Sequence, residues 1–184
     1  MIECIIQFGK SMRRSVSEAD KDHVQIVACG VLVHNDEVFL FQRKERDPKY
    51  QLYGKATIWQ GTHVPIQVGK HGLDLISTSL VERITRSLFL SREFEVSPIG
   101  YCWDPNDDKS SSHFGVIFRV NIDNDLMATD LRRKEFRKGR GHGIAGSFVN
   151  WATVNSGDVQ SSLENWSLTI LSNLKDFRDL QEAG

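Results

Sequence analysis

The segment from Lys55 to Leu90 constrains the fold of this chain more than any other. It opens with KATIW, which predicts a strand, and this strand runs into Gly61-Thr62-His63, which predicts a glycine turn. A strand, a turn and a helix whose polar face points at the turn are a common scaffold for phosphate binding. The helix is predicted by apolar residues three or four positions apart over about four turns, at Leu73, Ile76, Leu80, Ile84 and Leu88.

The polar face of the predicted helix carries charges of both signs. It is expected to hold Ser79, Glu82, Arg83, Arg86 and Ser87. A surface ion pair between Glu82 and Arg86, four residues apart, is the ordinary interpretation and contributes a few tenths of a kcal/mol. The other interpretation is that Arg83 and Arg86 bind phosphate oxygens, because a guanidinium group is a planar bidentate donor.

The motifs around this helix resemble one branch of the Nudix superfamily. LYGKATIWQGTHV precedes the helix, IGYCWDPNDDKSSSHFGVIFRV follows it, and Glu164-Asn165-Trp166-Ser167 is a further match. Members of that branch carry a glycine-glycine-histidine turn, a helix reading R-E-L-x-E-E-L, an acidic loop and a V-x-H-x-G-V strand. The resemblance implies an α/β fold, namely an α/β/α sandwich whose central mixed sheet lies between two main helices.

The helix departs from the pattern of that branch. The apolar positions place Glu82 to Leu88 on R-E-L-x-E-E-L, so Arg83 replaces one glutamate while Arg86 and Ser87 replace the two metal-binding glutamates. Shifting the alignment by one residue would bury Arg83, which costs several kcal/mol when the charge is unpaired. A degenerate Nudix box is therefore predicted, with no metal cofactor expected on this helix, since magnesium prefers carboxylate oxygens.

Four more residues are candidate ligand contacts. The resemblance implies that Arg43 approaches substrate phosphates, although a surface charge at a strand end is an equal alternative. Gly61 lies at the predicted turn. Trp59 and Tyr101 are candidates for stacking on a base, and core packing is the alternative for Trp59.

The hydrolase alternative rests on histidines and an acidic loop. His63 and His113 are weak candidates for a catalytic base, and a hydrogen-bonded structural role is the ordinary interpretation of His63. The carboxylates of Asp104, Asp107 and Asp108 would supply magnesium or manganese ligands. Asp residues beside Pro and Asn are equally typical of a turn.

The segment 130–146 is basic and rich in glycine. It is predicted to be a loop that wraps a phosphate, with Arg140 as a ligand contact, and residues 132–140 are the one stretch suited to nucleic acid. A solvated loop is the alternative. Residues 1–23 are expected to form an N-terminal arm or edge strand, through which a homodimer would form.

The rest of the chain is consistent with one domain spanning residues 1–184. Strands are expected at 24–34 and 37–43, as a hairpin, and at 93–103, 113–121 and 148–154; a final helix is expected at 161–180. The net charge of −1 gives no basic excess for nucleic acid. Three widely spaced cysteines and no membrane-length or signal-like apolar run predict a cytoplasmic protein.

Three functions follow as hypotheses. The first is a ligand sensor or pseudoenzyme that binds a nucleotide or another phosphorylated small molecule containing a diphosphate, without efficient metal-dependent hydrolysis. The second is a hydrolase of nucleoside-diphosphate linkages with a rearranged site. The third is a protein-interaction module with a vestigial pocket, acting through a partner protein or a second copy of the chain.

Overall fold

The computed structural model describes residues 12–17, 20, 22–35, 37–43, 54–65, 72–88, 94–106, 110–122 and 144–174. The chain divides into two compact units, the first within 1–30, 61–91 and 98–118 and the second within 31–60, 92–97 and 119–184. Four strands have residues in both units. These strands are β1 (Gln25–His34), β4 (Gln60–His63), β5 (Glu95–Cys102) and β6 (His113–Asn121).

The described chain forms one seven-stranded sheet. Its other strands are β2 (Glu37–Arg43), β3 (Ala56–Thr57) and β7 (Ile144–Asn150). The strand order is β3-β2-β1-β6-β5, with β4 paired to β1 and β7 paired to β2. The predicted α/β fold with a central mixed sheet is confirmed.

The hairpin expected at the start of the sheet is confirmed. β1 and β2 pair antiparallel, with Val33 opposite Val38 and His34 opposite Glu37. Asn35 turns the chain with a φ of 52°, in the left-handed region that asparagine tolerates better than most residues. β1 is buried from Val27 onward, as a run of β-branched and small apolar residues predicts.

Helix α3 (Gly72–Leu88), in the first unit, confirms the helix predicted from apolar spacing. Four of the five apolar positions are buried, namely Ile76, Leu80, Ile84 and Leu88. The prediction for Ser79 was wrong. Its side chain is buried, and its hydroxyl donates to the Leu75 carbonyl at 2.7 Å, which satisfies a polar group inside the apolar face.

The predicted glycine turn at Gly61-Thr62-His63 was also wrong. These residues lie in strand β4, and the Val64 amide donates to the Ile26 carbonyl at 3.3 Å just beyond it. Pairing with β1 satisfies the backbone in an extended conformation, so the local turn preference of glycine is overridden.

In the second unit β7 lies along the whole of β2, from Glu37 opposite Asn150 to Arg43 opposite Ile144. The ring centroids of Phe39 and Phe148 are 4.9 Å apart across this pair. Residues 144–146, expected in the basic loop, belong to this strand. The rest of that loop lies outside the described residues.

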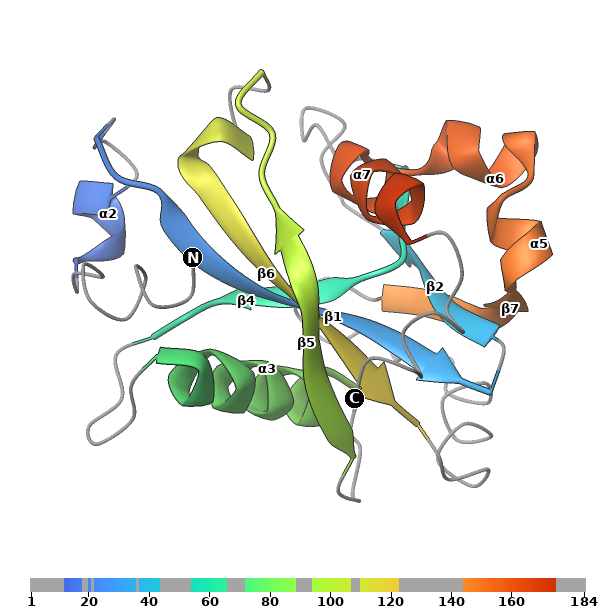
Figure 1. Ribbon diagram of the computed structural model, residues 1–184, viewed down its shortest axis with the longest axis horizontal. Helices are drawn as coiled ribbons and strands as arrows, with labels where there is room; N and C mark the ends of the chain where they lie inside the picture. The colour runs from blue at the N-terminus through green and yellow to red at the C-terminus, as the bar shows by residue number, and fades with distance from the viewer. Residues whose placement is uncertain are drawn as a thin grey trace. The chain divides into compact units, whose positions relative to one another are not determined.

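The C-terminal elements correct two predictions. Residues 151–154, expected to continue a strand, form helix α5 (Trp151–Val154), because the Asn150 side chain caps the Thr153 amide at 2.8 Å. The single helix expected at 161–180 is divided into α6 (Gly157–Ser162) and α7 (Asn165–Asn173), which follow α5 beside β2 and β7 in Figure 1. Leu163 and Glu164 are extended between them, and Leu163 forms a parallel bridge with Ala56.

Near the N-terminus the described part of the predicted arm holds a short helix, α2 (Arg14–Ser17), and the edge strand expected before it lies outside the described residues. The side chains of Cys29 and Cys102 are buried. None of the helices in the described ranges is long and apolar enough to cross a membrane.

Candidate functional site

The outer face of α3 carries two guanidinium groups. Arg83 and Arg86 are both exposed and lie three residues apart, which places them on one face of the helix. Glu82 is exposed beside them. Both guanidinium groups therefore lie on the solvent-facing side of α3.

The two histidine candidates, fifty residues apart in sequence, meet in the first unit. The rings of His63 on β4 and His113 on β6 have centroids 5.3 Å apart and planes tilted by 52°. Ser112 Oγ lies 2.9 Å from His113 Nδ1, within hydrogen-bond distance. Both side chains are half-buried. The two rings are therefore in contact with each other.

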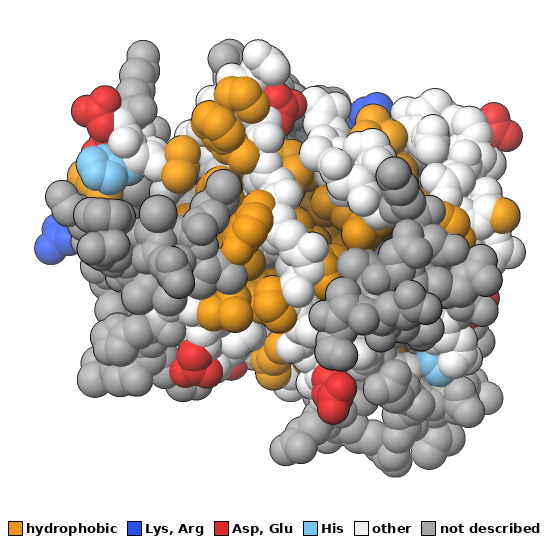
Figure 2. All heavy atoms as spheres, in the orientation of Figure 1, with side chains coloured by type: hydrophobic (Ala, Val, Ile, Leu, Met, Phe, Trp, Pro, Cys, Tyr) orange, Lys and Arg blue, Asp and Glu red, His pale blue; other side chains and the backbone are white. Residues whose placement is uncertain are grey.

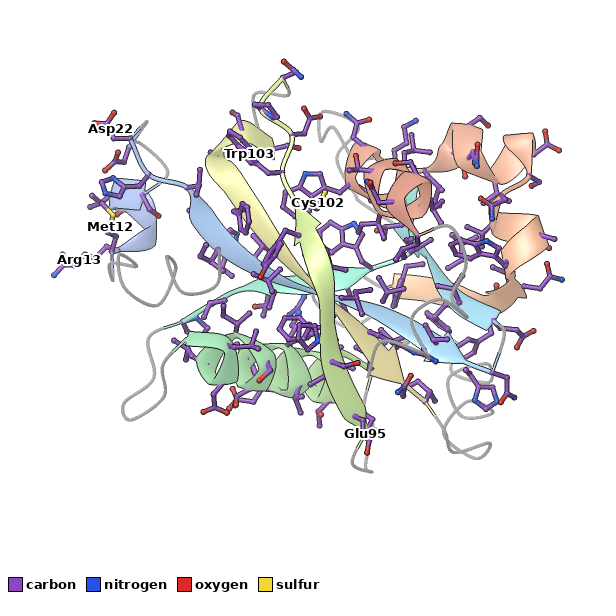
Figure 3. All side chains as sticks on the ribbon, in the orientation of Figure 1. Met12, Arg13, Asp22, Glu95, Cys102 and Trp103 are labelled. Atoms are coloured by element: carbon purple, nitrogen blue, oxygen red, sulfur yellow. The ribbon has the colours of Figure 1, made fainter. Side chains whose placement is uncertain are left out.

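The end of β5 exposes aromatic side chains. Tyr101 is 41% exposed, and its ring packs against Phe114 with centroids 5.5 Å apart. Trp103 is 49% exposed, and its Nε1 donates to the Ser111 carbonyl at 3.1 Å. In Figure 3 Trp103 lies just beyond the end of β5, opposite Glu95 at its start, and Figure 2 shows hydrophobic side chains reaching the surface on this face of the molecule. Two aromatic faces are therefore available for stacking in the first unit.

The acidic loop is described only in part. Asp104 Oδ1 accepts from the Asn106 amide at 3.0 Å, which confirms the expected turn. Asp107 and Asp108 lie outside the described residues. Among the residues that are described, no group of three or more His, Cys, Asp or Glu side chains is arranged to hold a metal ion.

Trp59, the other stacking candidate, is held by the Glu164 carboxylate in the second unit. Its Nε1 donates to Glu164 Oε1 at 2.8 Å, and its ring lies 5.5 Å from that of Trp166. These contacts favour the packing alternative for Trp59. They also connect the segment after β3 to the start of α7, more than a hundred residues later in the sequence.

Glu164 is the centre of a buried polar cluster that the sequence analysis did not find. The side chain is 6% exposed and caps α7, accepting from the Ser167 amide at 2.7 Å and the Trp166 amide at 2.9 Å. Its Oε1 also accepts from the Ser167 hydroxyl and, at 3.2 Å, from Thr57 Oγ1. Five donors therefore surround one carboxylate, which is the arrangement that makes a buried carboxylate tolerable. The match at Glu164-Asn165-Trp166-Ser167 was the available signal.

The structure describes the remaining candidate residues only in part. Arg43 ends β2 opposite Ile144, but its side chain is not among those described, and Arg140 lies outside the described residues. Gly61 lies within β4. The sequence analysis did not single out Arg119, because the pattern of its strand predicts only a strand. Its side chain is nevertheless only 9% exposed.

No protein-family model matches the chain. It is 21% identical over 169 residues to Protein YmaB of Bacillus subtilis (strain 168), covering 90% of this chain and 78% of that protein.

Solved structures show the fold class. The Nudix hydrolase candidate Tm1382 superposes with a TM-score of 0.63 at 16% identity, over 94% of this chain and 82% of its own. A MutT/Nudix protein of Listeria innocua gives 0.58 at 11% identity, over 87% and 96%. The Nudix domain of Shewanella oneidensis NrtR, solved with ADP ribose, gives 0.53 at 10% identity, over 92% and 99%. The chain thus has the Nudix fold.

Proposed function

We propose that this protein binds a nucleotide or another diphosphate-containing small molecule and does not hydrolyse it efficiently with a metal ion. The observation that carries the proposal is the pair of exposed guanidinium groups, Arg83 and Arg86, on one face of α3. A charge-assisted hydrogen bond to a phosphate oxygen is about twice as strong as a neutral one. Two such donors on one helix face suit the two phosphates of a diphosphate.

The donors on this face do not fit a divalent cation. Magnesium takes oxygen ligands, usually from one or two carboxylates together with substrate phosphates. A guanidinium group is a donor with no acceptor and a permanent positive charge. Arg83 and Arg86 would therefore repel the metal ion that Nudix-type hydrolysis uses.

Two further points support a nucleotide as the ligand. The Nudix domain of NrtR, which shares the fold, was solved in complex with ADP ribose. Tyr101 belongs to the same unit as the two arginines, and its 41% exposure leaves ring surface on which a base can stack.

Calorimetric titration with ADP-ribose, ADP and ATP tests the proposal. Arg83→Glu and Arg86→Glu, made separately, should each weaken binding about 10- to 150-fold, the equivalent of about 1.5–3 kcal/mol for a hydrogen bond to a charged group. Arg13→Glu is the matched control, since Arg13 is also exposed and the change in net charge is the same. Equal affinity in all four proteins would show that the arginines are surface charges.

A hydrolase remains the second candidate because His63 and His113 are in ring contact. It predicts that the same nucleotides are cleaved in magnesium or manganese, that chelator stops the reaction, and that His113→Gln slows it by about 100-fold or more. Product formation above background that chelator abolishes would replace the first proposal with this one.

A further inference from the structure

Gln60, the first residue of β4, places a carboxamide inside the second unit. The residue is only 5% exposed. Its Nε2 and Oε1 atoms are both buried, and neither has a hydrogen-bond partner among the residues that the structure describes. The side chain therefore offers a donor and an acceptor that the described chain leaves unpaired.

This burial is unfavourable for the protein alone. A buried carboxamide loses its hydrogen bonds to water, and at Gln60 the described residues replace none of them. A methionine has nearly the same shape and would fill the same space without that cost, because replacing unpaired polar atoms by apolar ones is close to neutral or stabilising. The carboxamide is thus suited to a partner that comes from outside the chain.

A second unpaired donor belongs to Trp166, in α7 of the same unit. Trp166 is 5% exposed, and its Nε1 is buried with no partner in the described ranges. The rings of Trp166 and Trp59 have centroids 5.5 Å apart. Trp59 directly precedes Gln60 in the chain and is only half-buried, so it brings this group of side chains to the surface.

The backbone holds the two segments together. The Ile58 amide donates to Ser167 Oγ at 3.1 Å. Ile58 lies two residues before Gln60, and Ser167 directly follows Trp166. The two side chains with unpaired atoms therefore come from segments that are already joined in the second unit.

The chemistry of these groups selects the ligand. A carboxamide carries its donor and its acceptor side by side in one plane, so it pairs with a ligand edge that has an acceptor beside a donor. An anion has no donor and a metal cation has no acceptor, so neither would satisfy both atoms. The edge of a nucleobase does, as in the pairing of glutamine with N6 and N7 of adenine. Two indole rings beside the carboxamide also suit a planar aromatic ring.

We propose that Gln60, Trp59 and Trp166 form a nucleobase-binding site in the second unit. Gln60 recognises an edge of the base that has a donor beside an acceptor, and Trp166 Nε1 is a further donor. The site goes beyond the function proposed above and does not depend on it. Arg83 and Arg86 belong to the first unit, and a nucleoside without phosphate is a sufficient probe.

Thermal unfolding and calorimetry with adenosine, inosine, N6,N6-dimethyladenosine and purine riboside test the site. Adenosine and inosine both carry an N–H donor beside an acceptor on the base, and both should raise the melting temperature. The other two nucleosides keep the ring system but lack that donor. They should bind about 5- to 150-fold more weakly, which is the discrimination of one bidentate base contact.

Substitution of Gln60 separates recognition from a structural role. Gln60→Met should abolish the gain with adenosine and, without nucleoside, melt no lower than wild type, because it removes two unpaired polar atoms and keeps an unbranched side chain. Gln160→Met, the same substitution in α6, should keep the gain. In NMR spectra of wild-type protein, the side-chain amide signals of Gln60 and the indole N–H signal of Trp166 should shift saturably with adenosine. Loss of these signals in Gln60→Met and Trp166→Phe assigns them.

Three results would overturn the proposal. A Gln60→Met protein that melts well below wild type, while adenosine leaves wild type unchanged, would make Gln60 a structural residue that binds internal water. A gain that survives the substitution, or that is equal for all four nucleosides, would place the base elsewhere. If Gln60→Met does not fold, Gln60→Glu serves for the assignment, and Gln60 amide signals that adenosine leaves unmoved would contradict the site.

Discussion

At the scale of single residues, Glu164 is the clearest case of a side chain that stabilises the fold of the second unit. Its carboxylate accepts from two backbone amides of α7 and from the side chains of Thr57, Trp59 and Ser167. A glutamine would replace one acceptor oxygen by a donor in a site made only of donors. Glu164→Gln should therefore lower the free energy of unfolding by about 1–3 kcal/mol.

Urea denaturation followed by tryptophan fluorescence measures this change. Asp158→Asn, the same kind of substitution at an exposed carboxylate in α6, should stay within about 0.5 kcal/mol of wild type. If both variants lose the same stability, the buried cluster has no special role.

The sequence could not reveal these residue roles. Trp59 and Glu164 are 105 positions apart, and nothing local to either segment indicates that an indole N–H will meet a carboxylate. Arg119 was missed for a related reason. The pattern HFGVIFRVN predicts a strand. It does not predict that the arginine would be buried along with the apolar residues on either side of it.

At the scale of elements, the spacing of apolar residues predicted helix α3 correctly. The positions of glycine residues predicted turns and loops incorrectly. Spacing works for α3 because its buried face repeats at the helical period, whatever it packs against. Glycine occurs in turns, loops and strands alike, and pairing with a neighbouring strand determines which of these conformations it adopts. Gly61 was expected in a turn and Gly146 in a loop, yet both lie in paired strands. The division of the last helix likewise depended on Glu164, two of whose partners, Thr57 and Trp59, are remote in sequence.

Gly146 gives the prediction at this scale. A Cβ at this position would lie 2.8 Å from the Leu40 carbonyl oxygen and would overlap the ring of Phe39. Because the carbonyl belongs to the backbone of β2, it cannot move aside without disturbing the β2–β7 pairing. Gly146→Ala should destabilise the fold by about 1–3 kcal/mol.

Gly157→Ala is the matched control for that measurement. A Cβ at Gly157 meets nothing within 4 Å, and the residue begins α6, where alanine is the better helix former. Its melting temperature should equal or exceed that of wild type. A Gly146→Ala protein as stable as Gly157→Ala would show that β2 and β7 do not approach as closely as described.

At the scale of the whole molecule, the order of the motifs predicted the fold class, since strands and helices of those lengths in that order match the Nudix pattern. It left the function open, because one fold serves many chemistries through the residues placed on it. The single-domain prediction is also a matter for experiment. Because β1 and β6 run through both compact units, we expect one cooperative unfolding transition.

Two probes measure that cooperativity. Far-UV circular dichroism reports the sheet and helices of both units, and tryptophan fluorescence reports three side chains in the second unit, Trp59, Trp151 and Trp166, and one in the first, Trp103. Coincident transitions are predicted. Separate midpoints would show that the two units fold independently.

The central claim is that guanidinium groups on α3 hold a diphosphate where a metal ion would otherwise be needed. A crystal structure of the protein grown with ADP-ribose and magnesium tests it most directly. The account predicts phosphate oxygens about 2.7–2.9 Å from the guanidinium nitrogens of Arg83 and Arg86. A magnesium ion coordinated on this face beside Glu82, or a diphosphate bound away from both arginines, would contradict it.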